Sequence, residues 1–231
     1  MQLDRKLGFL VAVYHTFETW AGDVPVSCKP GCADCCTRNV TATTLEAFYL
    51  LSELPEAQTW MEKINKIVDL PRFQPAMTLN TLASCLRDGG EPPEEVSDPA
   101  WWPCPFLDAK GLCGVYDRRP FGCRCFHSAT ACGTEGLSTP DMFIMTVSQV
   151  MLQFLEQVDQ PGYAGNFIDL VRAMMAAGGA DAYAEGRLSI SEPGVQPCRS
   201  IPLLLVPPED QMRIRPYLET LQRLYREWFS R

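Results

Sequence analysis

Apolar residues recur three and four positions apart along much of this 231-residue chain. Such spacing places them on one face of an α-helix, so the pattern predicts helices rather than strands. The N-terminal helix is expected to carry its apolar face on Leu3, Leu7, Leu10, Tyr14 and Phe17. Further helices are expected after Thr43, after Pro55, over Leu79–Leu86, over Met142–Val158, over Phe167–Met174 and from Pro216 onwards.

Local signals mark where some of these helices begin and end. Thr43 and Glu46 have the spacing of a capping box, in which each residue bonds the backbone N–H of the other. Thr139, Pro140 and Asp141 predict a second start, with a cap, a proline in the first turn and an acid near the positive end of the helix dipole. Glycine pairs are expected to end two helices, at 89–90 and 178–179.

Two stretches depart from the helical pattern. Residues 89–105 are rich in proline and predict a connection, whereas residues 104–136 contain many turn formers and, at most, a short hairpin around Gly111–Tyr116. No run of alternating strands is present. We therefore predict a mainly α fold, with a single domain over 1–231 whose C-terminal part, 138–231, is helical and whose cysteine-rich loop region is irregular.

Composition and charge narrow the class of protein. Hydrophobic residues make up 46% of the chain and charged residues 21%, which is ordinary for a folded soluble protein. The net charge of -8 argues against nucleic-acid binding, which needs a basic face. No signal peptide pattern and no apolar stretch long enough to cross a membrane is visible. We expect a cytoplasmic protein, in which a disulfide framework is disfavoured.

Clustered cysteines are the main chemical signal of the sequence. Nine of the 11 cysteines fall in two stretches, one with Cys28, Cys32, Cys35 and Cys36 and the other with Cys104, Cys113, Cys123, Cys125 and Cys132. In a reducing compartment this pattern indicates metal ligands rather than packing residues. The adjacent Cys35 and Cys36 are awkward for one tetrahedral ion, because consecutive side chains diverge. They favour two different ions or a shared multinuclear site.

Basic residues lie among the cysteines of the second stretch. Several thiolates on one ion leave a negative site, which guanidinium groups would offset. Arg119 and Arg124, together with Tyr116, are therefore the residues that we expect to surround the ligands. The alternative is that the two arginines form a solvated face.

The remaining candidates have a plainer interpretation. His127 is either a fifth ligand or proton shuttle, or, more commonly for such a residue, a loop histidine that hydrogen-bonds. Cys125 is an extra ligand or a free thiol, and a redox sensor would need it exposed and readily ionised. Cys85 is expected to be a buried structural thiol. Cys198, in a proline-rich loop, is expected to stay out of the site, and His15 to be structural.

The cysteine stretches also carry a family resemblance. The strings CPFL (104–107), GLC (111–113), RP (119–120) and CR (123–124), with the first cysteine stretch, resemble the CxxCxxCC (YkgJ-type) family of zinc- or iron-chelating domains over residues 26–134. The resemblance implies eight chelating cysteines, which here are Cys28, Cys32, Cys35, Cys36, Cys104, Cys113, Cys123 and Cys132. Two features depart from the family pattern: the first gap has three residues instead of two, and Cys125 stands where relatives usually lack cysteine.

The sequence gives less direct information on which metal the cysteines bind and on the role of that metal site. Two four-sulfur zinc sites would use eight cysteines, whereas iron–sulfur clusters would use four or eight. The paired Cys35 and Cys36 and the long second stretch favour iron slightly over zinc. Three roles are open: a metal-binding protein, an iron–sulfur-dependent enzyme resembling the protein lysine methylases to which some relatives are similar, and a redox or metal sensor. The expected partners are a metal ion and a protein, either as partner or as substrate.

Overall fold

The computed structural model describes most of the chain. The described residues are 2–22, 24–29, 31–54, 57–95, 102–132 and 138–229. About 50% of the structure is helical, which confirms the predicted mainly α fold. Parts of the predicted connection at 89–105 and of the cysteine-rich region at 26–134 lie outside the described residues, as does Pro55.

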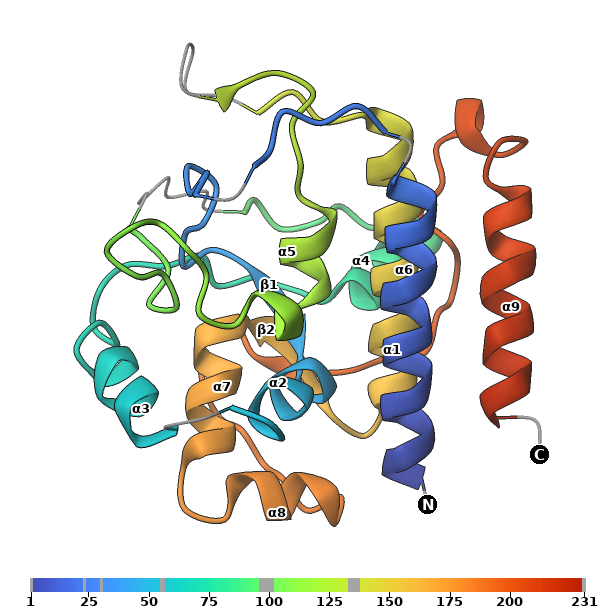
Figure 1. The fold of residues 1–231 in the computed structure, drawn as a ribbon. Coiled ribbons are helices and arrows are strands. Elements are labelled where there is room, and N and C mark those ends of the chain that lie inside the picture. Colours follow the sequence, from blue (N-terminus) through green and yellow to red (C-terminus); the bar gives the residue numbers. More distant parts are fainter. Residues whose placement is uncertain are drawn as a thin grey trace.

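The expected helices are present, and two of them pack along the N-terminal one. They are α1 (Gln2–Ala21), α2 (Thr44–Leu51), α3 (Ala57–Asn65), α4 (Leu79–Arg87), α6 (Met142–Asp159), α7 (Phe167–Met175) and α9 (Arg215–Phe229). In Figure 1, α6 runs beside α1, and α9 lies on the outer side of this pair. The face of α1 predicted from the sequence is in the core, where Leu10 and Phe17 are buried. No helix among the described residues is both long and apolar enough to cross a bilayer.

The ends of the helices agree only in part with the sequence signals. The capping box of α2 forms as predicted, with the Thr43 N–H donating to the Glu46 carboxylate at 2.8 Å. The predicted cap at Thr139 is wrong. Asp141 caps α6 instead, because its carboxylate accepts the N–H of Ile144 at 3.0 Å, the third helical position.

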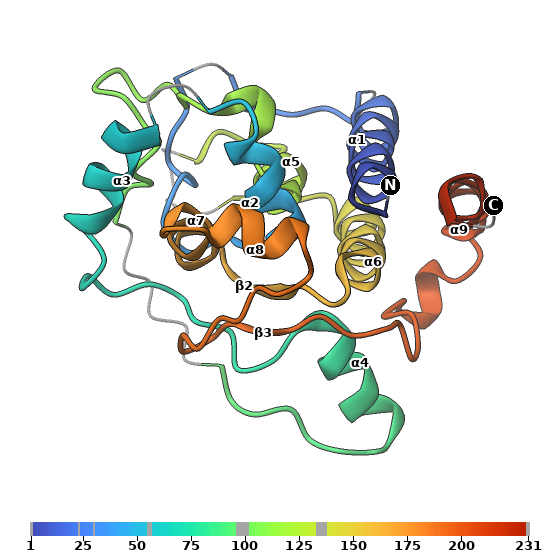
Figure 2. The same cartoon turned by 90° about the horizontal axis from the view of Figure 1, so that it is seen from below.

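Short elements were missing from the sequence prediction. Three antiparallel strands form a small sheet in the order β1 (Thr41–Thr43), β2 (Tyr163–Asn166) and β3 (Gln196–Pro197). Figure 2 shows β2 and β3 between α7 and α4. Two further helices are α5 (Phe121–Cys125) and α8 (Gly179–Ala184). The glycine pair at 178–179 therefore begins α8, since Gly178, at φ 75°, lets the chain turn and restart a helix.

The predicted hairpin is present in reduced form. A single antiparallel bridge joins Leu107 to Cys113, slightly earlier in the chain than expected. The N–H of Gly114 donates to the carbonyl of Phe106 at 2.8 Å, and the Asp108 carboxylate accepts the N–H of Leu112 at 2.8 Å. Together with the short helices at 116–118 and 121–125, this turn is the regular structure of the second cysteine stretch within its described residues.

A buried carboxyl group joins three helices of the core. Asp159, at the end of α6, is fully buried and accepts hydrogen bonds from the Thr44 hydroxyl at 2.6 Å, the Leu45 N–H at 2.9 Å and the Tyr183 hydroxyl. The Lys6 ammonium donates to the Asp159 carbonyl at 3.1 Å. Burial raises the pKa of Asp159 from 3.8 to about 6, because the charged form loses its hydration.

This raised pKa predicts the pH dependence of stability. We expect the free energy of unfolding of the metal-free protein to rise by about 1–1.5 kcal/mol as the pH falls from 7 to 5. The folded-state pKa lies above the unfolded one, so the contribution is fully present below about pH 4 and is lost as the pH rises through about 6. Burial also raises the pKa values of Glu46 and Glu156, which acts in the same direction.

Urea denaturation at the two pH values, in a chelating buffer, measures this effect. Asp159→Asn removes the titrating group and should flatten the pH dependence by about the amount stated, whatever its effect on stability at a single pH. An unchanged slope in the variant would show that another group is responsible.

Candidate metal centre

The two cysteine stretches lie against each other in the structure. At one end, the Ser27 N–H donates to the Ser128 carbonyl at 2.8 Å. At the other end, the Cys104 N–H donates to the Cys36 carbonyl at 2.9 Å, beside an antiparallel bridge between Thr37 and Pro103. The loop that carries the first cysteine stretch, residues 28–36, is therefore fixed between the two ends of the second stretch.

Two glycines allow the two cysteine stretches to approach each other closely midway along their length. Gly31 and Gly111 have φ values of 82° and 75°, a left-handed conformation that favours glycine. A Cβ atom at Gly111 would lie 3.2 Å from the Gly31 carbonyl oxygen and 3.4 Å from the Cβ of Ala33. A larger residue at Gly111 would push the first cysteine loop away from the second.

Four thiols from separate segments come together at this junction. Cys36 follows the first loop, Cys104 begins the second stretch, Cys113 ends the short turn, and Cys123 lies on α5. Charge on any of the other three affects the ionisation of Cys36; Cys104 and Cys113 affect that of Cys123, and Cys113 affects that of Cys104. The four thiols are thus neighbours, although as described they do not form a group that could hold an ion. We call them the four-thiol centre.

The protein alone holds most of these thiols in the protonated form. Burial raises the pKa of Cys104 to about 12 and also raises the pKa values of Cys113 and Cys123, and neighbouring thiols add to the effect at Cys104 and Cys123. A hydrogen bond from the Cys35 thiol to the Cys36 sulfur lowers the pKa of Cys36, because it stabilises the thiolate. The same bond raises the pKa of Cys35. A bound cation would reverse the effect of burial, because it favours thiolates.

The other predicted ligands lie at the edge of this junction. Cys28 is exposed, and Cys32 and Cys132 are partly buried. The Ser27 hydroxyl donates to the Ala129 carbonyl at 2.9 Å, which places the residue before Cys28 beside the segment that leads to Cys132. Within the described residues, no three Cys, His, Asp or Glu side chains stand in an arrangement that could hold an ion. Ligation by all eight cysteines therefore stays a prediction.

Two of the residues expected around the ligands lie beside each other. The Arg119 guanidinium is 3.8 Å from the centroid of the Tyr116 ring. Its positive charge favours the thiolate forms of Cys113 and Cys123 and so opposes part of the effect of burial. This position is the one expected for a residue that offsets thiolate charge.

Arg124 makes different contacts. Its guanidinium forms an ion pair with Glu18 of α1, donates to the Arg119 carbonyl at 3.0 Å and lies 4.2 Å from the centroid of the Tyr14 ring. None of these partners is a candidate ligand. The contacts hold α5 against α1.

The structure also assigns positions to the cysteines outside the ligand list. Cys125 is 5% exposed, its thiol is 3.6 Å from the Gly122 carbonyl, and burial raises its pKa to about 12. Cys125 therefore lacks the exposure and the lowered pKa that a redox sensor would need at this position, because its side chain packs in the core. Cys198 is buried with its thiol 3.9 Å from the Asp159 carboxylate, and Cys85 is partly buried.

Two residues have more contacts than the sequence indicated. The Glu46 carboxylate accepts the N–H of Phe121, the first residue of α5, at 2.7 Å and the hydroxyl of Tyr14 at 3.0 Å. His127 is 9% exposed and its Nδ1 lies 3.0 Å from the Cys125 carbonyl oxygen. The expected hydrogen bond of this loop histidine is thereby confirmed.

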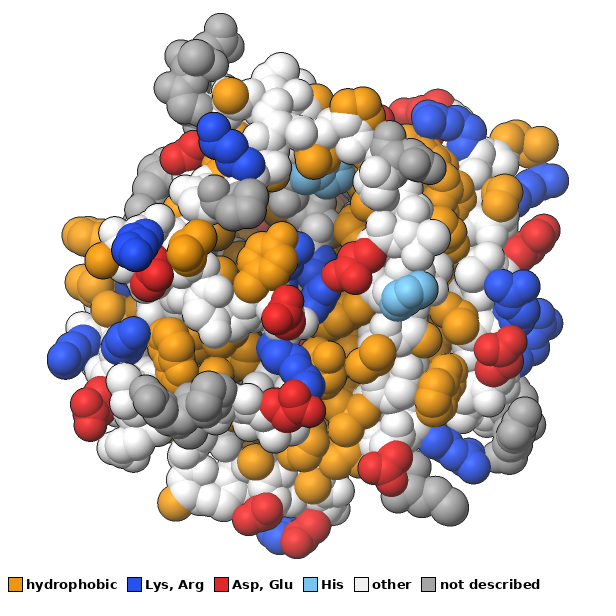
Figure 3. All heavy atoms as spheres, in the orientation of Figure 1, with side chains coloured by type: hydrophobic (Ala, Val, Ile, Leu, Met, Phe, Trp, Pro, Cys, Tyr) orange, Lys and Arg blue, Asp and Glu red, His pale blue; other side chains and the backbone are white. Residues whose placement is uncertain are grey.

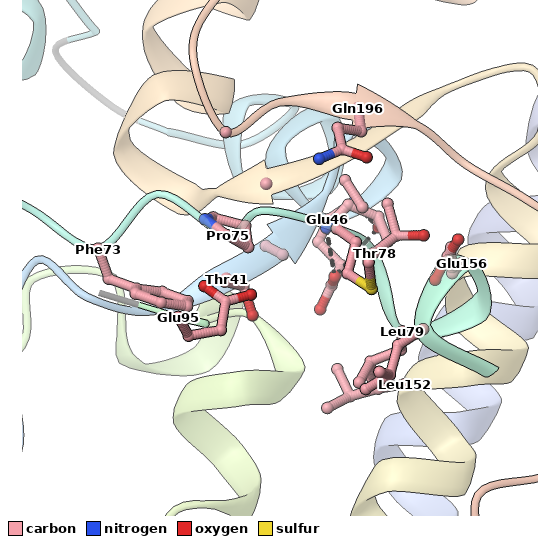
Figure 4. Close-up of a pocket in the computed structure, with 17 residues that line it drawn as sticks. Thr41, Glu46, Phe73, Pro75, Thr78, Leu79, Glu95, Leu152, Glu156 and Gln196 are labelled. Carbon is pink, nitrogen blue, oxygen red and sulfur yellow. Dashed lines mark hydrogen bonds between the residues drawn. The ribbon is translucent and has the colours of Figure 1, made fainter. Parts of the chain in front are cut away.

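A cavity of about 200 Å³ lies between the small sheet, α4 and α6 (Figure 4). Its walls are mostly apolar, and none of the residues that line it is a cysteine. The Glu156 carboxylate at its edge already accepts N–H groups of Asn80 and Arg199, at 2.9 and 3.0 Å. On the face of the molecule that Figure 3 shows, hydrophobic and charged side chains are interspersed.

Comparison with known proteins gives one match. A family model named CxxCxxCC and described as "Putative zinc- or iron-chelating domain" matches residues 27–144, slightly more than half of the chain. The matched segment begins one residue before Cys28, ends within α6 and includes every predicted ligand. Searches among curated proteins and among solved structures gave no match.

Proposed function

Because the chain belongs to the CxxCxxCC family of domains described as zinc- or iron-chelating, we propose that its two cysteine stretches chelate zinc or iron through eight cysteines. The bound metal would fix the first loop, the short turn and α5 relative to one another. The four-thiol centre is the observation that carries this proposal, because its members come from distant parts of the chain.

The chemistry of the donor set suits both metals. Four sulfur ligands in tetrahedral geometry are typical of structural zinc and of iron–sulfur sites. The Arg119 guanidinium, whose charge favours the thiolate forms of Cys113 and Cys123, would offset negative charge on bound thiolates. The preference for iron over zinc rests on the adjacent Cys35 and Cys36 and stays a prediction.

The enzyme and sensor hypotheses have less support. An enzyme needs a pocket with polar groups that can orient a substrate, and the apolar cavity between the sheet and α4 lacks cysteines in its walls. A thiol sensor needs an exposed cysteine with a lowered pKa, and Cys125 is buried with a raised one. Metal chelation is therefore the function proposed for the cysteine-rich region.

Metal analysis of protein purified without oxygen tests the proposal. We expect the purified chain to carry one or more equivalents of zinc or iron, because neighbouring cysteine thiolates bind such ions strongly once the metal draws them together. Iron with acid-labile sulfide and a visible charge-transfer band would identify an iron–sulfur centre. Colourless protein with zinc would identify a closed structural site.

A variant with serine at all four positions of the four-thiol centre is the control. It should bind less metal than the natural chain under the same conditions. Natural protein that carries neither metal, and that acquires none on anaerobic reconstitution, would contradict the proposed function.

A further inference from the structure

His127 is held so that one ring nitrogen is free to bind. Its Nδ1 lies 3.0 Å from the backbone carbonyl oxygen of Cys125, and a carbonyl only accepts hydrogen bonds. In the neutral ring Nδ1 therefore carries the proton, and Nε2 carries the lone pair. Metal-binding histidines typically have this arrangement, in which a backbone carbonyl fixes the nitrogen that faces away from the ion.

The Nε2 atom lacks a partner among the described residues. It is buried, and no donor on these described residues reaches it. The whole side chain is only 9% exposed. A buried acceptor without a hydrogen bond is destabilising, so a partner other than these side chains would stabilise the arrangement.

The loop around His127 joins the two cysteine stretches. On the next residue, the Ser128 carbonyl accepts the Ser27 N–H at 2.8 Å and the Ser128 hydroxyl accepts the Thr139 N–H at 2.8 Å. These bonds hold the loop between α5, which carries Cys123, and the residue that precedes Cys28. His127 is thus fixed at a junction that two predicted ligands share.

We infer that His127 supplies a nitrogen ligand, through Nε2, to metal bound on the Cys28 side of the two cysteine stretches. This inference rests on the proposed function and extends it. The site would then hold sulfur and nitrogen donors together, as in the Cys₃His sites that bind zinc. The family pattern is defined by cysteines, so the imidazole is an additional donor of this chain.

X-ray absorption at the metal edge of the zinc-loaded chain tests the inference. The natural protein is expected to show an imidazole nitrogen beside the sulfur ligands. His127→Asn keeps an N–H donor near the position of Nδ1 and removes Nε2, so it should lose that nitrogen signal. Its zinc affinity, measured by chelator competition, should fall by roughly 10- to 100-fold or more. A loss of that size is typical when a residue that only hydrogen-bonds a metal ligand is removed.

His15→Gln is the matched control, because His15 is the other of the chain's two histidines and is exposed. It should keep both the nitrogen signal and the affinity. His127→Gln provides a second test variant if His127→Asn fails to fold by circular dichroism. An all-sulfur signal in the natural protein, or unchanged affinity in the folded His127 variants, would overturn the inference but leave chelation by cysteines intact. Natural protein without any bound metal would overturn both.

Discussion

Replacing Cys123 with serine is expected to abolish metal binding at the four-thiol centre. Cys123 is partly buried, and its thiol interacts electrostatically with those of Cys36, Cys104 and Cys113. A serine hydroxyl is a hard, neutral donor at neutral pH and does not replace a thiolate on zinc or iron. Structural zinc sites contribute about 10–16 kcal/mol to folding, so the loss of one ligand is expected to lower the free energy of unfolding by several kcal/mol.

The matched control lies two residues away on the same helix. Cys125→Ala removes a thiol that bonds the Gly122 carbonyl within the core, so it should leave the metal content unchanged. Metal-to-protein ratios after gel filtration, with urea denaturation, measure both effects. Loss of metal is likewise predicted for Cys28→Ser and Cys35→Ser, and none for Cys85→Ser. A Cys198→Ser variant that loses metal while Cys132→Ser retains it would show that the ligand list is wrong.

The contrast between Cys123 and Cys125 shows where prediction from sequence ends. Their spacing alone marks both as candidate ligands. Which one faces the other cysteines depends on how α5, a helix of only five residues, packs against α1 and α6. No periodic pattern of that length fixes a buried face, so this distinction comes from tertiary contacts.

The fold shows the same division between local and distant information. The α2 cap was predictable because Thr43 and Glu46 bond within one helical turn. The small sheet was not, because β1 has three residues and pairs with β2 more than a hundred positions later. Strands this short offer no alternation to detect. For the site, the cysteine spacing indicated metal binding, whereas the proximity of four particular thiols required the structure.

Replacing Glu46 with glutamine is expected to have the second large effect, although Glu46 is not a predicted ligand. The side chain is 1% exposed, and each carboxylate oxygen accepts two hydrogen bonds. One oxygen is bonded by the N–H and hydroxyl of Thr43, at 2.8 and 3.0 Å, and the other by the N–H of Phe121 and the hydroxyl of Tyr14. The amide nitrogen of glutamine cannot accept, so at least one buried donor loses its partner. We expect a loss of about 2–4 kcal/mol in the free energy of unfolding.

Glu46 also determines where α5 begins, which links this prediction to the metal. Phe121 is the first residue of α5, and its N–H has no acceptor within the helix, so Glu46 acts as a cap from a distant part of the chain. When that bond is lost, Cys123 is held less firmly, and the Glu46→Gln variant should bind metal more weakly in a chelator competition. Tyr14→Phe removes one bond to the same carboxylate and should cost only about 1 kcal/mol, with little effect on metal affinity. Equal metal affinity in the two variants would show that Glu46 stabilises the core without positioning the ligand.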